Sequence, residues 1–473
     1  MKSKYIYTLL FFMLILSTSC KKYLDLKPTG KVTIEKTDEF YQLVSLPNRA
    51  YPINNFQYLS DDQYMKESNV IGRPINIDII NFTFDEKTSR TNIIQSSSLY
   101  NQAYSYINRW NIIISLVDDS EGDQTLKTLA KAEAKVNRAF DHFLLVNTYA
   151  KHYDAATANS DGGICIMDEY NLEAKPAKST VAAVYAFIEK DLDEAIPFLQ
   201  DKPANPYHPS LAYAYALKAK VHLFKKEFAK AAAAAKQSLA INNKIYDLVA
   251  YSKLTGTRPN ITADLNPEVL NLVYMTGYTE LSFGYNSVIS PELRTLFGTN
   301  DARFNLFFDT TNATWIDVAA GSAWWTPKYN TFFYPTVSMK TTEVQLMLAE
   351  CEARAGNLEE AIRLVNEIRV KKVNTNASLA VPATIKATVD VIIAERRKEL
   401  LFGFNRFWDL RRLNTEPDYA KTIVRVFPIV NKTVPQQTYT LQPNSFLYII
   451  PFAQDVLKAN PSLTLNTGET RPF

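Results

Sequence analysis

Two glutamates stand four residues apart in a charged stretch, Glu395 and Glu399, and could act as paired carboxylates. Such pairs carry out general acid and base catalysis in glycoside hydrolases, where the acid needs a pKa raised by burial away from positive charge. Here basic residues stand at helical i,i+3 spacing from most carboxylates, and a basic partner lowers a carboxylate pKa. We therefore expect a structural ion-pair network and no catalytic residue. The expected pairs are Arg396–Glu399, Glu395–Lys398, Arg406–Asp409 and Asp409–Arg412.

The histidines and cysteines lack the spacing of a metal or nucleophile site. The four histidines are scattered and form neither a His-Glu-x-x-His motif nor a Cys/His ligand pattern. Three cysteines can form one disulfide at most, which leaves a thiol over. Cys351 is centred in the apolar stripe of its predicted helix, and we interpret it, like His142 and His152, as a packing residue. The sequence thus predicts no metal site, no cofactor and no disulfide framework.

Composition places the chain among ordinary globular proteins. It has 473 residues, of which 47% are hydrophobic and 21% are charged. The 52 Lys and Arg nearly cancel the 49 Asp and Glu, so no global field attracts nucleic acid, and we expect no nucleic-acid partner. The chain has only 13 glycines, few for Gly-rich phosphate loops, whereas aromatic residues make up 12% of it. This aromatic surplus directs attention to ligand binding by rings.

Aromatic side chains beside amides and acids could bind a neutral sugar, because flat rings stack on the C–H face of a sugar while polar groups bind its hydroxyls. For any single ring the alternative is burial in the core, since Trp and Tyr are usually largely buried. Two clusters have the required composition. The first comprises Tyr58, Asp61, Asp62 and Arg73, with Tyr100 and Asn101 further along the chain, and the second comprises Tyr285, Asn286, Trp315, Trp324 and Trp325.

The N-terminus has the features of an export signal followed by a lipidation site. Lys2 and Lys4 precede an apolar run of about a dozen residues, which is typical of a signal peptide and too short to span a bilayer. Small residues then lead to Cys20, as in a bacterial lipobox, although Leu16 stands one position earlier than the usual leucine. We expect residues 1–19 to be cleaved, Cys20 to carry a lipid, and residues 20–36 to form the tether. A chance cysteine after a plain signal peptide is the alternative.

Helical periodicity dominates much of the remaining chain. It predicts helices over residues 97–118, 124–151 and 179–199, with Ser179 and Thr180 placed as N-caps. Residues 210–241 and 341–373 share a small-large-small register, which is the spacing of tetratricopeptide hairpins; two unrelated hairpins are the alternative. The matched positions are Ala219, Phe228 and Ala231 in the first copy and Ala349, Leu358 and Ala361 in the second, where Gly356 also suits a helix end.

Residues 245–336 and 414–473 are rich in Asn, Thr, Pro, Gly and aromatics and have no sustained period. Long irregular segments in a compact protein are usually functional loops. The sequence therefore predicts a mostly α fold. We expect a tetratricopeptide-like α-hairpin superhelix over residues 37–244 and 337–413, carrying a loop-rich irregular cap with few short strands over 245–336 and 414–473.

Several spaced motifs together resemble the SusD/RagB family of outer-membrane nutrient-binding lipoproteins. They lie at residues 103–111, 132–147, 191–195, 395–412 and 450–468. Gly403, Phe404, Leu465 and Thr467 depart from the residues usual in the family. The resemblance covers nearly the whole chain. It implies ligand contacts in the N-terminal loop, in the irregular insert and at the start of the helix that carries 103–111, where Tyr100 takes the place of a frequent tryptophan.

The resemblance implies a non-catalytic lipoprotein, anchored in the outer membrane and facing the cell surface. Such a protein binds an oligosaccharide or similar nutrient and passes it to a SusC-like, TonB-dependent β-barrel transporter. Two other functions stay open at this point. The hairpins could form an envelope scaffold whose rings merely pack, or the protein could be a peptide-binding member of the same family.

Overall fold

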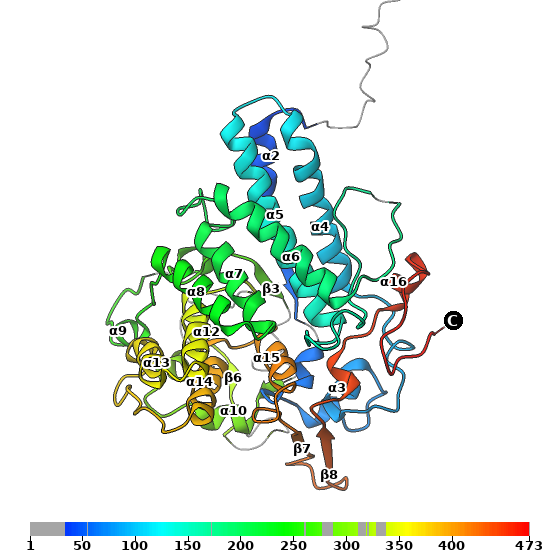
Figure 1. Cartoon of the computed structure of the whole chain (residues 1–473). Helices are drawn as coiled ribbons and strands as arrows, with labels where there is room; N and C mark the ends of the chain where they lie inside the picture. The colour runs from blue at the N-terminus through cyan, green and yellow to red at the C-terminus, as the bar shows by residue number, and fades with distance from the viewer. Residues whose placement is uncertain are drawn as a thin grey trace, which may run out of the picture.

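Paired α-helices make up most of the computed structural model of the chain (Figure 1). The structure describes residues 34–53, 55–171, 173–259, 262–276, 287–310, 318, 321–327 and 337–472. Within these ranges the strands are short and occur in pairs. The predicted mostly α architecture with helical hairpin repeats is confirmed.

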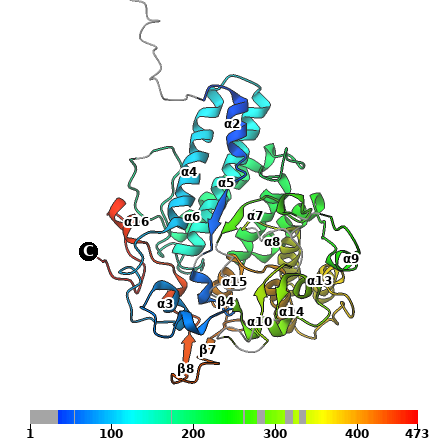
Figure 2. The ribbon, with the colours of Figure 1, turned by 180° about the vertical axis from the view of Figure 1, so that it is seen from behind.

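Four helices form the upright part of the molecule in Figures 1 and 2. A side chain caps three of them at the N-terminus, because a free side-chain oxygen there accepts an otherwise unpaired backbone N–H. The capping residues are Ser97, Asp123 and Thr180, the last as predicted. The helices are α2 (Thr37–Val44), α4 (Ser98–Leu116), α5 (Gln124–Tyr149) and α6 (Val181–Ala195).

Two helical hairpins reproduce the predicted repeat. They are α7 (Leu211–Phe224) with α8 (Phe228–Ile241), and α12 (Thr341–Arg354) with α13 (Leu358–Lys372). The small residues of the register, Ala219, Ala231, Ala349 and Ala361, are all buried, so the helices of each hairpin approach closely. The chain turns through the left-handed region after α7 at Lys226 and after α12 at Gly356, with φ of 61° and 88°. The two turns thus share one geometry, although only one of them has glycine. The two hairpins are joined by the packing of α8 on α12.

The remaining helices follow this scaffold or interrupt it. α14 (Ile385–Glu399) packs against α12 and α13, and α15 (Asn405–Leu413) follows it. The shorter helices are α3 (Ile77–Thr83), α9 (Leu248–Ser252), α10 (Pro291–Leu296), α11 (Ala302–Phe307) and α16 (Gln454–Ala459).

Among the described residues, short strands pair into four two-stranded sheets, two of which connect distant parts of the chain. The strand pairs are β1 (Ala50–Pro52) with β3 (Tyr274–Thr276), β2 (Gln63–Met65) with β4 (Ser287–Ile289), β5 (Phe308–Asp309) with β6 (Trp324–Trp325), and β7 (Ile423–Phe427) with β8 (Gln437–Leu441). Only β1–β3 is parallel. The first two pairs fasten the segment after α2 to the segment between the two hairpins, so both are held against the helical scaffold.

Candidate functional site

A cavity of about 550 Å³ lies between α4, the loop of residues 165–176, and α16. In Figures 1 and 2 the C-terminal helix α16 lies beside α4, although the two are far apart in sequence. Two of the predicted binding residues, Tyr100 and Asn101, line this α4–α16 cavity. The full lining is Tyr100, Asn101, Tyr104, Ser105, Ile107, Asn108, Asn111, Cys165, Met167, Asn171, Ala174, Pro176, Asp455, Val456, Ala459 and Asn460.

One face of α4 supplies the aromatic and amide side chains of the cavity. Tyr100, Tyr104, Asn108 and Asn111 follow one another at helical spacings of four, four and three residues, and Ile107 stands three after Tyr104, which places them on the same side of the helix. A helix holds such a row at fixed spacing, so the rings and amides are presented together before any ligand arrives.

The Tyr100 ring is held from several directions and remains half-buried. Its centroid lies 4.6 Å from that of Tyr104, and it meets the rings of Tyr149 and Phe452 edge-on at 5.3 and 5.7 Å. Desolvation on burial raises the pKa of Tyr100, so the phenol is neutral at physiological pH. A ring fixed in this way offers a flat surface for stacking at little cost in side-chain entropy.

Hydrogen bonds from α4 anchor the loop that forms the opposite wall. The Tyr104 hydroxyl donates to the carbonyl of Cys165 at 2.8 Å. The Asn111 amide donates to the carbonyls of Met167 and Glu169 at 3.1 and 2.8 Å. Side-chain bonds to backbone carbonyls fix the path of a loop, so this wall is pre-formed and does not depend on ligand for its position.

Arg138 of α5 reinforces this anchoring from behind. Its guanidinium donates to the side-chain oxygen of Asn111 and to the carbonyl of Asp168, each at 2.8 Å. It also forms a buried ion pair with Asp191 at 2.7 Å. Because Asn111 has its amide nitrogen and its oxygen both engaged, it supports the wall and has little capacity left for a ligand.

The third wall comes from α16 and the residues after it. One carboxylate oxygen of Asp455 accepts hydrogen bonds from Ser96 at 2.6 Å and from the amide of Asn101 at 2.9 Å. The Asn460 amide donates to the carbonyl of Pro176 at 2.8 Å. These bonds tie the C-terminal segment to both α4 and the loop, and they close the cavity on this side.

Two polar side chains of the lining keep their hydrogen-bonding capacity free. The side chains of Ser105 and Asn108 form no hydrogen bond with any residue that the structure describes, and both are at least partly exposed. Tyr170, whose side chain is 47% exposed, stands in the loop next to the lining residue Asn171. The cavity therefore combines a fixed ring with free donors and acceptors, which is the chemistry that binds a polyhydroxylated molecule.

Sequence reasoning missed several of these residues. Tyr104 and Asn108 follow Tyr100 by four and eight positions, so the periodicity of the predicted helix could have identified them. No local signal could have found Asp455 or Asn460, because they reach the cavity only through the packing of the C-terminal segment.

The structure places two residues of the first predicted cluster in the interior. Tyr58 is 1% exposed and packs edge-on against Phe82. Asp61 is buried and forms a two-point ion pair with Arg406 at 2.6 and 2.7 Å. Burial alone would raise the pKa of Asp61, but Arg406 and the basic residues beside it hold this pKa well below its usual range. Both residues serve the core, so we do not include them in the candidate site.

The other two residues of this cluster also lie outside the α4–α16 cavity. Asp62 pairs with the guanidinium of Arg397 at 2.6 Å. Arg73 is exposed, and its guanidinium donates to the carbonyl of Ser68 at 2.9 Å. Of the first cluster, the structure therefore brings only Tyr100 and Asn101 to the cavity.

The second predicted cluster is represented by two buried tryptophans. Trp324 is fully buried, and Trp325 packs against Phe307, Phe308 and Phe402. Both rings belong to the core, and neither lines the α4–α16 cavity; Trp325 instead lines a separate small cavity of about 60 Å³. Tyr285, Asn286 and Trp315, together with the predicted lipidation site Cys20, lie outside the described residues.

The paired glutamates sit in a dense cluster of opposite charges. Glu395 contacts Arg303 and Lys398 at 2.7 Å and Arg369 at 2.8 Å. Glu399 contacts Lys340 at 2.9 Å and Arg303 at 3.0 Å. Burial opposes ionisation, but these bases outweigh it, lowering the pKa of Glu395 to about 2 and that of Glu399 further. A general acid needs the opposite shift, so this pair is not equipped for glycoside hydrolysis.

The ion-pair prediction holds for two of its four pairs. Glu395–Lys398 and Arg412–Asp409 are present at 2.7 and 2.8 Å. Arg396 instead pairs with Asp409 at 2.9 Å, and Arg406 pairs with Asp61. The predicted Arg396–Glu399 and Arg406–Asp409 pairs are therefore replaced by contacts between different elements, because buried side chains take the partner that tertiary packing brings closest.

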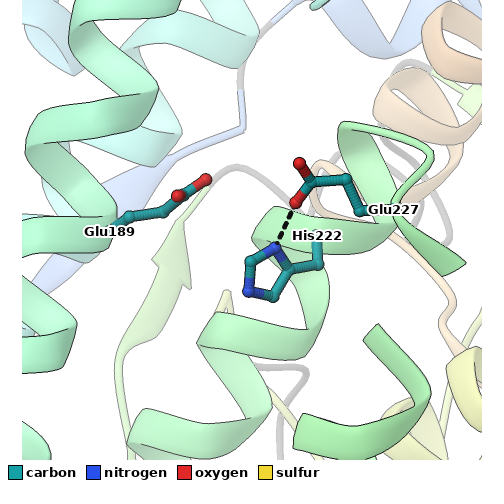
Figure 3. A group of neighbouring side chains, drawn as sticks. All are labelled: Glu189, His222 and Glu227. Carbon is teal, nitrogen blue, oxygen red and sulfur yellow. Dashed lines mark hydrogen bonds and ion pairs between the residues drawn. The ribbon is translucent and has the colours of Figure 1, made fainter. Parts of the chain in front are cut away.

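A separate group of metal-ligand side chains lies between α6, α7 and α8 (Figure 3). The His222 ring meets a carboxylate oxygen of Glu227 at 2.7 Å, and Glu189 is the third member. The ammonium of Lys225 contacts Glu189 at 2.5 Å and Glu227 at 3.3 Å. The chain thus provides its own cation between these carboxylates, and we interpret the group as an ion-pair cluster that joins the helices.

None of the helices that the structure describes is long and apolar enough to cross a membrane.

Comparisons with known proteins point to one family. Residues 22–223 match a protein family described as starch-binding and associating with the outer membrane, and residues 315–468 match the SusD family. The chain is 26% identical over 376 residues to SusD-like protein P2 of Formosa agariphila, which covers 67% of this chain and 71% of that protein.

Solved structures share the fold. A putative sugar binding protein from Bacteroides vulgatus superposes with a TM-score of 0.72 at 20% identity, covering 93% of this chain and 100% of that one. A SusD superfamily protein from Bacteroides thetaiotaomicron superposes with a TM-score of 0.70 at 20% identity, covering 91% of this chain and 98% of that one. A SusD-like carbohydrate binding protein from Bacteroides vulgatus superposes with a TM-score of 0.67 at 17% identity, covering 93% of this chain and 99% of that one.

Proposed function

Because the chain belongs to the SusD/RagB family, we propose that it is a non-catalytic binding protein that holds an oligosaccharide nutrient in the α4–α16 cavity. One observation carries the proposal: the fixed ring of Tyr100 and the free side-chain amide of Asn108 line the same pre-formed cavity of about 550 Å³. That volume lies within the range of small-molecule sites. The names of solved relatives, a putative sugar binding protein and a SusD-like carbohydrate binding protein, support the same ligand class.

The binding test is calorimetry with a panel of neutral hexasaccharides and a parallel panel of short peptides. We expect at least one saccharide to bind and the Tyr100→Ala variant to lose that binding. Binding of peptides alone would support the peptide-binding alternative, since free amides can also bind a peptide backbone. Binding of neither panel would leave the envelope scaffold as the better function.

We further propose that the protein acts at the outer membrane as a lipoprotein. The signal-like segment before Cys20 and the outer-membrane description of the matching family support this location. Replacing Cys20 by Ala should release the protein from the membrane fraction, because the acyl chains would be missing. Unchanged membrane association of this variant would contradict acylation. Accessibility of the wild-type protein to protease on intact cells would test whether it faces the cell surface.

The expected partner is a SusC-like, TonB-dependent β-barrel transporter. The family assignment supports this pairing, which would let the bound nutrient pass directly into the transporter. Affinity purification of the tagged protein from solubilised outer membranes, followed by mass spectrometry, should recover such a barrel. A membrane preparation from which no barrel protein co-purifies would count against the partnership.

The absence of catalysis is testable on the same saccharides. Since the surrounding bases keep Glu395 and Glu399 ionised, we expect no release of reducing ends from any saccharide that binds. Release of reducing ends that disappears in the Glu395→Gln variant would overturn this part of the proposal.

A further inference from the structure

The lining of the α4–α16 cavity is poor in charge. Among the described residues that line it, none is a lysine, an arginine or a histidine, and Asp455 is the only carboxylate. The other polar members are amides, hydroxyls and one thiol. The cavity therefore offers a ligand no fixed positive charge and one negative charge.

Two basic side chains stand behind the walls, and both are engaged. The ammonium of Lys178 donates to the Thr464 carbonyl at 3.2 Å and to the side chain of Asn466 at 3.0 Å, and desolvation lowers its pKa. Arg138 is committed to its ion pair with Asp191. The guanidinium of Arg138 is therefore neutralised within the protein, and the ammonium of Lys178, although it has no acidic partner among the described residues, is not part of the cavity lining.

The rim of the cavity does not supply the missing positive charge. The loop beside it carries Asp168, Glu169 and Glu173 against Lys175, α16 adds the exposed Lys458, and α4 adds Arg109 next to the lining residue Asn108. The three acids and the three bases balance, so the rim adds no net charge to the single carboxylate of the lining.

The carboxylate of Asp455 is held but not neutralised. It accepts hydrogen bonds from Ser96, Asn101 and the backbone N–H of Val456. These donors are all uncharged, and no salt bridge joins Asp455 to a basic residue that the structure describes. Its negative charge therefore faces whatever enters the cavity.

From this charge distribution we propose that the cavity selects uncharged saccharides and rejects those that carry carboxylate or sulfate groups. The inference rests on the proposed function and adds to it the chemical class of the ligand. An anionic substituent would lose water and approach Asp455 without gaining a cation, which weakens binding by about tenfold in a partly solvated site. A neutral saccharide uses the ring and the amides without this penalty.

The test compares each neutral probe with its own oxidised derivative. The probes are maltohexaose, cellohexaose, laminarihexaose and mannohexaose, and in each derivative the primary hydroxyls are converted to carboxylates on the same backbone. Calorimetry should give at least about tenfold weaker binding for the derivative of every probe that binds. Added NaCl should narrow this difference and leave neutral binding unchanged, because salt screens only the charged term.

A matched pair of variants assigns the difference to Asp455. Asp455→Asn keeps an oxygen that accepts from Ser96 and Asn101 and removes the charge, so the penalty on the oxidised derivative should shrink several-fold. Asp201→Asn removes an exposed charge that is not part of the lining and should leave the penalty unchanged. If Asp455→Asn does not fold, the salt titration of the wild-type protein decides the question alone.

The outcomes separate this inference from the proposed function. If an oxidised derivative binds as tightly as its parent or more tightly, and Tyr100→Ala abolishes that binding, the charge selectivity is overturned while the saccharide-binding function stands. If neither the neutral nor the oxidised saccharides bind, the proposed function itself fails, and the inference fails with it.

Discussion

The α4–α16 cavity and the ion-pair network around α14 use similar residue types for opposite purposes. Both contain carboxylates, amides and aromatic rings. In the network, Glu395 and Glu399 are each contacted by several bases, and their charges are used entirely within the protein. In the cavity, the side chain of Asn108 forms no hydrogen bond within the described chain, and Asp455 has no basic partner there. A polar residue serves function when the fold leaves its bonding capacity unused.

The largest expected effect comes from breaking the network. Glu395→Ala would leave Arg303, Arg369 and Lys398 buried with one carboxylate fewer, which should lower the free energy of unfolding by about 3–5 kcal/mol. Urea denaturation followed by circular dichroism measures this loss. As control, Asp193→Ala breaks the surface pair with Lys218 and should cost less than about 1 kcal/mol. Equal losses in both variants would contradict the distinction between buried and exposed pairs.

The second-largest expected effect is a loss of stability when acid protonates the carboxylates of the ion-pair network. Since the pKa of Glu395 is lowered to about 2 from an ordinary value of 4.5, its stabilisation is complete above pH 4.5 and is lost as the pH falls towards 2. The loss for this one group is of the order of 3 kcal/mol. Urea denaturation at pH 7, 4.5 and 3 measures it, and the Glu395→Gln variant should show a smaller dependence in this window. A free energy of unfolding that is unchanged from pH 4.5 to 3 would contradict the assignment.

Breaking the cavity should change binding more than stability. Tyr100→Ala removes the stacking face and should weaken saccharide binding by about 10- to 100-fold, with only about 1–2 kcal/mol lost from the free energy of unfolding, because the ring is half-buried. Tyr100→Phe keeps the ring and should retain most of the affinity. Calorimetry with the tightest neutral hexasaccharide measures both. Strong binding by the alanine variant would place the ligand elsewhere.

The smallest expected effect comes from comparing an amide side chain without a hydrogen-bond partner, Asn108, with one that is hydrogen-bonded, Asn366. Asn108→Ala should weaken binding a few-fold and change the free energy of unfolding by less than about 0.5 kcal/mol. Asn366 exchanges two hydrogen bonds with the backbone of Leu379, at 3.0 and 2.8 Å. Asn366→Ala should therefore lower the free energy of unfolding by about 1–2 kcal/mol and leave binding unchanged. A loss of stability in Asn108→Ala together with a loss of binding in Asn366→Ala would contradict the distinction between free amides in the cavity and hydrogen-bonded amides in the scaffold.

Local patterns predicted the helices well, because helix formation depends on neighbours within a few residues. Thr180 caps α6 as expected, and the alanines of the hairpin register are buried. The turn at Lys226 adopts the same left-handed geometry as that at Gly356, although a lysine there costs about 1–2 kcal/mol. Packing of the hairpin overrides this local preference.

The site was predictable only in part. Tyr100 and Asn101 combine a ring with an amide at the start of a helix, and both line the cavity, while their role in binding stays a prediction. Trp324 and Tyr58 have the same character in the sequence and yet are core residues. A ring in isolation gives no information on whether another segment will cover it.

The sequence by itself determined the helical hairpins, the family motifs and the presence of an ion-pair network, because each of these depends on residue spacing within one or two turns. The tertiary structure alone decided which bases meet which acids, which rings are covered, and that Asp455 and Asn460 close a cavity begun by Tyr100. The physical reason is that burial and charge pairing are energies between segments distant in the chain, and they are fixed only when those segments pack together.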